Sequence, residues 1–136
     1  MTAEMMNRLF AFSSAAAHDS DGFGEWRVRA EESGRLTVEH NVLGAVTDFG
    51  SFSLSPSETA SLWDLITAAA IEQRVPSRRA IVPHETLLAF ALSAQETLHS
   101  VQLWANEAFA DESIARLIED VEKLIEKYTG TKPVLR

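Results

Sequence analysis

The sequence contains no cysteine, and positively charged residues are scarce in it. Without cysteine the chain can form no disulfide, use no thiolate nucleophile and build no Cys-ligated zinc site. Only 12 Lys and Arg residues stand against 20 Asp and Glu residues, which gives a net charge of −8. Such a balance argues against nucleic-acid binding, because a protein that binds phosphates needs a basic surface.

Long apolar runs are also absent, since no stretch approaches the ~20 apolar residues that a membrane-spanning helix needs. The sequence therefore predicts no membrane association, and we expect a cytoplasmic protein. Its 136 residues, 46% of them hydrophobic and 24% charged, are typical of one globular domain. We predict that this α+β domain covers residues 25–136, and that residues 1–24 form an N-terminal extension.

The N-terminal extension allows two interpretations. An apolar run followed by alanines at 15–17 fits a cleaved signal peptide, whereas the acidic Glu4 does not suit such a signal. A short helix is the favoured alternative, because Met5, Leu9 and Phe12 are spaced by four and three residues and would share a face. The extension would then end in a loop.

From Glu25 onward, apolar side chains recur at every second position, as in half-buried strands. Three strands are predicted at 25–31, 35–42 and 46–54, and Gly50 is expected to mark a β-bulge. Two further strands follow within "TLLAFALSAQETLHSVQLWA", residues 86–105, and turn through "SAQE".

Two helices have clear start signals. Ser55 is the expected N-cap of the first helix, with Pro56 at its first position and Glu58 completing a capping box. Asp111 is the expected cap of the last helix. That helix carries seven apolar or aromatic residues at helical spacing, which are Ile114, Leu117, Ile118, Val121, Leu124, Ile125 and Tyr128.

The predicted order is therefore β-β-β-α-β-β-α after a short N-terminal element. Consecutive strands joined by short turns pair antiparallel. We expect a two-layer sandwich, in which two helices cover one face of a five-stranded, mainly antiparallel sheet.

No motif for catalysis, cofactor binding or metal binding is present. His40 and His99 lack the spacing of a metal site, and the serines lack the GxSxG elbow of a hydrolase. We therefore expect a protein that is not an enzyme and holds no cofactor or metal. A hydrolase whose site has no recognisable motif is the competing hypothesis.

The last two predicted strands carry apolar side chains on both faces, yet two helices can cover only one face. We predict that the uncovered face is an interface for a partner protein or a second copy of the chain. A second candidate contact is the basic group Arg74, Arg78 and Arg79, which is either a solvated loop or a site for an anion or an acidic partner. The residues predicted at the apolar interface are Phe49, Leu87, Ala89, Ala91, Val101 and Leu103.

From about Glu25 to Tyr128, the chain resembles the emfourin family of small bacterial proteins that inhibit thermolysin-like metalloproteases. The matching features are the strand meander, the helix "LSPSETASLWDLI" after a Ser/Pro-type cap, the strand pair "LLAFALSAQETLHSVQLW" and the final helix. The glycine-rich early turn of that family is replaced by "SGR" at 33–35, and no inhibitory residue carries over. The resemblance implies inhibition of a metalloprotease as a narrower form of protein binding.

Overall fold

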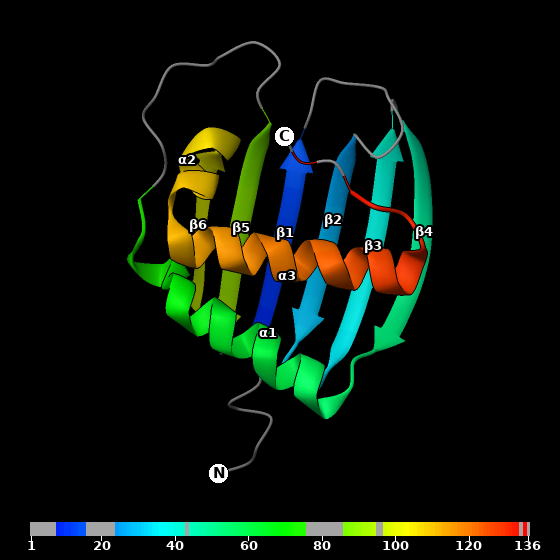
Figure 1. Ribbon diagram of the computed structural model, residues 1–136, viewed down its shortest axis with the longest axis horizontal. Helices are drawn as coiled ribbons and strands as arrows, with labels where there is room; N and C mark the ends of the chain where they lie inside the picture. Colours follow the sequence, from blue (N-terminus) through cyan, green and yellow to red (C-terminus); the bar gives the residue numbers. More distant parts are fainter. Residues whose placement is uncertain are drawn as a thin grey trace.

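The computed structural model describes residues 8–15, 24–42, 44–75, 86–94, 97–133 and 135. They form a six-stranded antiparallel sheet in the order β4-β3-β2-β1-β5-β6, with the helices packed on one face (Figure 1). The elements are β1 (Arg8–Ala15), β2 (Glu25–Glu31), β3 (Arg35–Val42), β4 (Ala45–Ser53), α1 (Pro56–Ala69), η2 (Ile71–Gln73), β5 (Leu87–Ala94), β6 (Thr97–Trp104), α2 (Ala105–Ala110) and α3 (Glu112–Thr129). The predicted α+β class and two-layer arrangement are confirmed.

The predicted number of strands is wrong, because the N-terminal residues add a sixth strand. β1 lies in the middle of the sheet, antiparallel to β2 on one side and to β5 on the other. Phe10 and Phe12 are buried beneath the helices, whereas Leu9 and Ala11 lie on the opposite face. The helix expected from the spacing of Leu9 and Phe12 is therefore also wrong. Pairing with β2 and β5 selects a strand, in which the period of two in "LFAFS" places Phe10 and Phe12 on one face.

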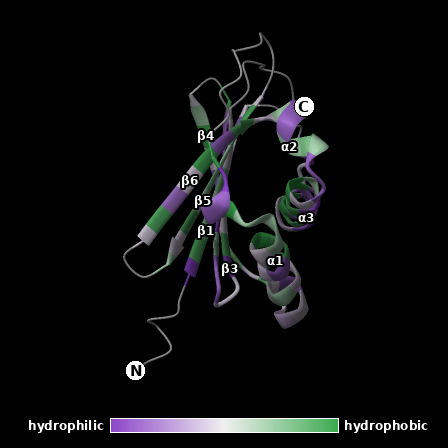
Figure 2. Cartoon of the chain, turned by 90° about the vertical axis from the view of Figure 1, so that its left-hand side faces the viewer, coloured by the Kyte–Doolittle hydropathy of each residue, from purple (hydrophilic) through white to green (hydrophobic). Residues whose placement is uncertain are grey.

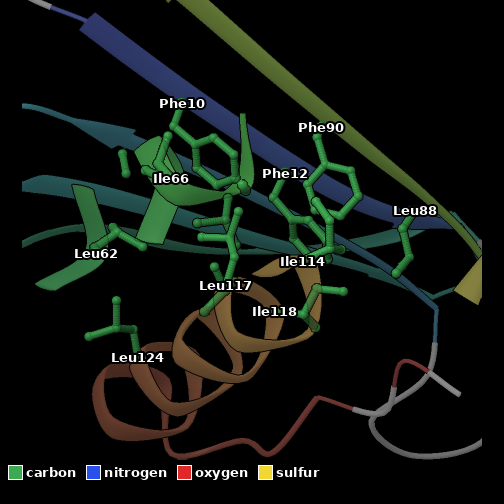
Figure 3. Packing of buried hydrophobic residues seen from close by; sticks show 14 of the residues in the cluster. Phe10, Phe12, Leu62, Ile66, Leu88, Phe90, Ile114, Leu117, Ile118 and Leu124 are labelled. Atoms are coloured by element: carbon green, nitrogen blue, oxygen red, sulfur yellow. The ribbon is translucent and has the colours of Figure 1, made fainter. Parts of the chain in front are cut away.

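The core lies between the sheet and the helices α1 and α3. Phenylalanine rings from β1 and β5 meet the apolar stripes of both helices (Figure 3). In α3 the predicted stripe is confirmed: six of its members are buried and Tyr128 is half-buried. Burial of this stripe explains why α3 stays on the sheet, because apolar area removed from water is the main favourable contribution to folding.

Gly50 is part of a β-bulge, as predicted. The register between β3 and β4 passes from Val38 opposite Gly50 to Glu39 opposite Asp48, so Phe49 is the extra residue. Gly50 has a φ of 82°, which favours glycine, and its N–H donates to a carboxylate oxygen of Asp48 at 2.8 Å. The bulge interrupts the regular pairing of the β4 edge.

The capping box of α1 forms as predicted and also connects α1 to α3. The Ser55 hydroxyl accepts from the Glu58 N–H at 3.1 Å, and the Ser55 N–H donates to Glu58 at 2.9 Å. On the α3 side, the Glu58 carboxylate accepts from Lys127 Nζ and from the Tyr128 hydroxyl, both at 2.6 Å. These hydrogen bonds, first that from Lys127 and then that from Tyr128, lower the pKa of Glu58 from 4.5 to about 2.

We expect Glu58→Gln to lower the thermal midpoint at neutral pH, and we expect the difference from the wild type to shrink in acid. Because the folded-state pKa of Glu58 is lowered, its contribution is complete above about pH 4.5 and is lost as the pH falls toward about 2. Thermal denaturation at a series of pH values measures this difference. Glu72→Gln, at an exposed position of η2, is the control. A Glu58→Gln deficit that is constant from pH 7 to about pH 2 would contradict the assigned contacts.

Candidate functional site

The two faces of the sheet have different surroundings. The described helices all lie on one side, and in the described part of the chain no helix covers the other side (Figure 2). Residues that are paired on neighbouring antiparallel strands point to the same face, so the register assigns each side chain to a face. We call the side without helices the open face.

Three of the predicted interface residues, all on β5, lie on the open face. Leu87, Ala89 and Ala91 are half-buried, whereas Leu88, Phe90 and Leu92, which alternate with them, are buried beneath the helices. The central strand β1 continues this surface, because Ala11 is paired with Ala91 and Leu9 with Ser93. The open face is therefore apolar or small over β1 and β5. The members of this surface on β1 and β5 are Leu9, Ala11, Ser13, Leu87, Ala89, Ala91 and Ser93.

The side chains of Val101 and Leu103 do not point to the open face, so the face predicted for them is wrong, although Val101 is among the residues that line the hollow described below. Val101 is paired with Phe90 and Leu103 with Leu88, and both therefore point toward the helices. The reason is the register of the hairpin, which pairs each even-numbered residue of β5 with an odd-numbered residue of β6. The β6 residues on the open face are Leu98, Ser100, Gln102 and Trp104.

Phe49 is also wrongly assigned to the interface. As the extra residue of the bulge it packs against the buried core, with its ring centre 6.2 Å from that of Trp26 and nearly parallel to it at 11°. Because a bulge places two residues opposite one, alternation along β4 no longer gives the face of the side chain. The β-bulge predicted at Gly50 could have shown that the face of Phe49 does not follow from alternation along the strand.

A hollow of about 480 Å³ lies on the open face and crosses β2, β1, β5 and β6. Its floor consists of small side chains, chiefly Ala11, Ala89 and Ala91, while Gln102 lies on the β6 side. Sequence reasoning did not identify Ala11 or Gln102 as site residues. The alternation of side chains along β1 and β6 could have identified Ala11 and Gln102 as residues of this face, but only after β1 had been recognised as the central strand.

Two arginines of β2, Arg27 and Arg29, line the other side of the hollow. Arg27 forms an ion pair with Glu25 at 3.0 Å. Arg29 is exposed and forms no ion pair with a described residue. The hollow therefore has a positively charged side, although the chain as a whole has a net charge of −8.

The basic group predicted as an anion contact is only partly described. Arg74 donates to Asp111 at 2.8 Å, to the Ser113 hydroxyl at 3.0 Å and to the Ala69 carbonyl at 2.6 Å. These contacts connect the end of α1 to the start of α3, and the hydrogen bond from Arg74 is the first cause that lowers the pKa of Asp111 to about 2. Arg74 is thus engaged within the fold. Arg78 and Arg79 lie outside the described residues.

The histidines considered for a metal site are far apart. His40 lies on β3 and stacks on Trp26 with ring centres 3.8 Å apart, whereas His99 lies on the edge strand β6. β2, β1 and β5 separate their strands, which places them about 19 Å apart across the sheet at ~4.8 Å per strand. Within the described ranges, no group of three or more His, Asp or Glu residues is placed to hold a metal ion.

Fold and site together define an α+β protein in which the described helices leave one sheet face, with a hollow in it, uncovered. Comparison with known protein families finds no family model that matches this chain, and comparison with curated proteins finds no match either. The resemblance to emfourins therefore stays a prediction. None of the described helices is long and apolar enough to cross a membrane.

Proposed function

We propose that the chain is a non-enzymatic protein-binding module that uses the open face over β1, β2, β5 and β6. The observation that supports this proposal is the apolar character of a face that the helices leave uncovered. A sheet with one covered face ordinarily alternates between apolar residues inside and polar residues outside. β2 and β3 follow that rule, with Arg27, Arg29, Thr37 and Glu39 outside, whereas β1 and β5 place leucines and alanines outside.

The chemistry of the hollow favours binding over catalysis. Among the described residues that line it, the only charged side chains are those of Arg27 and Arg29, and no carboxylate or imidazole stands beside the hydroxyls of Ser13 and Ser100. A hydrolase needs a nucleophile or a general base that converges with a second polar group, and arginine stays protonated at any physiological pH. The small side chains at the floor of the hollow allow close approach of a complementary protein surface.

The partner that fits this face presents an apolar surface with a carboxylate at its margin. The alanines of β1 and β5 allow close approach of another backbone or of large side chains, and apolar area buried there drives association. Arg29 then pairs with an acidic side chain of the partner, since arginine binds carboxylates through two parallel hydrogen bonds.

We expect Ala89→Arg to abolish binding of this partner, because a long charged side chain would fill the floor of the hollow. Ala68→Arg is the matched control, as Ala68 is exposed on α1, on the other side of the molecule. The tagged wild type and both variants are used for affinity capture from native cells, and the captured proteins are quantified by mass spectrometry. A partner retained by the wild type and by Ala68→Arg, but lost with Ala89→Arg, is the expected result.

The same capture gives the result that would overturn the proposal. Identical captured proteins for all three forms, with circular dichroism showing that each is folded, would mean that the open face binds nothing. Arg29→Glu gives a second test, because reversal of this charge should weaken the binding of a partner that presents a carboxylate.

A further inference from the structure

The side chains that line the hollow form two rows across the sheet. Each row has an arginine on β2, small residues on β1 and β5, and a neutral polar residue on β6. The rows are Arg29, Ala11, Ala91 and Ser100, and Arg27, Ser13, Ala89 and Gln102. The hollow therefore has a low floor between guanidinium groups at one end and neutral hydrogen-bonding groups at the other.

The floor of the hollow consists of small side chains and sheet backbone. Phe12 and Phe90 also line the hollow although their side chains point to the helices, so their backbone lies at the floor. β1 and β5 each have a neighbouring strand on both sides, and their backbone N–H and C=O groups are paired within the sheet. Apart from the Ser13 hydroxyl, the floor is therefore suited to an apolar group such as an aromatic ring, which can lie on the alanine methyl groups.

The size of the hollow corresponds to a small molecule. Its volume of about 480 Å³ lies within the ~300–1,000 Å³ of ordinary ligand sites. β2 and β6 are three strand spacings apart, roughly 14 Å at ~4.8 Å each, and the two rows are ~7 Å apart along the strands. These dimensions leave room for a ligand of one or two rings that contacts an arginine at one end and Gln102 at the other.

Arg29 supplies a charge that such a ligand can pair with. Its neighbours on the adjoining strands, Ala11 and Thr37, are uncharged, and it forms no ion pair with a described residue. Arg27, by contrast, is paired with Glu25 at 3.0 Å. No carboxylate is among the described residues that line the hollow, so a ligand carboxylate meets no like charge there. It can accept two parallel hydrogen bonds from the free guanidinium.

We propose that the hollow binds a small aromatic carboxylate. The ring lies on Ala11 and Ala91, the carboxylate pairs with Arg29, and Gln102 hydrogen-bonds to a polar substituent at the far end. Burial of the ring drives association, and the ion pair selects for an anion. This binding needs no other protein. Because the protein partner proposed for the open face uses the same floor, ligand and partner exclude each other, and this exclusion alone rests on the proposed function.

Titration of the purified full chain with indole-3-acetate tests the proposal, with the backbone amide shifts in NMR spectra as the measurement. We expect saturable shifts at Ala11, Ala89 and Ala91, with a Kd of roughly 1 mM for a ligand of this size. Indole-3-ethanol, which has a hydroxyl in place of the carboxylate, should bind about tenfold more weakly. Absence of shifts at these amides up to ~10 mM indole-3-acetate, or equal affinity for the two ligands, would overturn the proposal.

Variants of the chain test the roles of the two parts of the hollow. Arg29→Gln should weaken the binding of indole-3-acetate about tenfold and leave that of indole-3-ethanol unchanged. Arg35→Gln is the matched control, because Arg35 is exposed on β3, on the same face as Thr37, and does not line the hollow. Ala91→Phe, with its fold checked by circular dichroism, should abolish the binding of both ligands.

Two results with these variants would overturn the proposal. Arg29→Gln with the wild-type affinity for indole-3-acetate would show that the ion pair does not form. Folded Ala91→Phe with that affinity would place the ligand outside the hollow. Both measurements use the purified chain, so they are independent of the affinity capture that tests the protein partner.

Discussion

Phe10→Ala should lower the free energy of unfolding by about 3–5 kcal/mol, one of the largest effects of any single substitution in this chain. Phe10 has 0% exposure and lies on the central strand, where its ring faces the helix layer (Figure 3). Removing the ring removes the favourable burial of its apolar surface and leaves a cavity that the strands on both sides cannot close. Urea denaturation followed by circular dichroism measures the difference.

Leu9→Ala is the control for this prediction, because Leu9 neighbours Phe10 on β1 but points to the open face and is half-buried. Leu9→Ala should lower the free energy of unfolding by clearly less than Phe10→Ala does. Phe10→Ala with the stability of the wild type would mean that β1 is not part of the folded sheet in solution.

Leu117→Ala should cost about 2–5 kcal/mol, a large part of the ~5–15 kcal/mol that stabilises an ordinary domain. Leu117 also has 0% exposure and belongs to the buried stripe of α3. We expect a lower midpoint in the same urea titration. Glu119→Ala, at an exposed position two residues further along α3, should have little effect. Equal midpoints for both variants would show that α3 does not pack on the sheet.

The helices were predictable because their signals are local. The cap at Ser55, the capping box with Glu58 and the cap at Asp111 are all formed by residues within four positions of one another. The α3 stripe is likewise contained in a single element, and its hydrophobic period of 3.6 residues distinguishes it from a strand.

The central strand and half of the predicted interface were not predictable in the same way, because they depend on pairing between distant residues. In β1, the spacing of Leu9 and Phe12 is compatible with a helix, and only the pairing with β2 and β5 selects the strand. For Val101 and Leu103, the face depends on the register of the hairpin, and a shift by one residue reverses every side chain of a strand. Ala89 and Ala91 were correctly assigned to the open face, because they alternate with Phe90, whose large apolar ring identifies the side of β5 that the helices cover.

The central position of β1 has a consequence for the order of folding. β1 is the first of the described strands to be synthesised, yet one of its two neighbours is β5, and the pair Phe12–Phe90 joins positions 12 and 90 of the chain. Closing so long a loop is entropically costly and slows folding. The four strands β1 to β4 can pair as a meander during synthesis, but one edge of β1 stays open until β5 has been made. The nascent chain therefore exposes an apolar strand edge from the synthesis of β1 until that of β5, a period when chaperone binding or aggregation competes with folding.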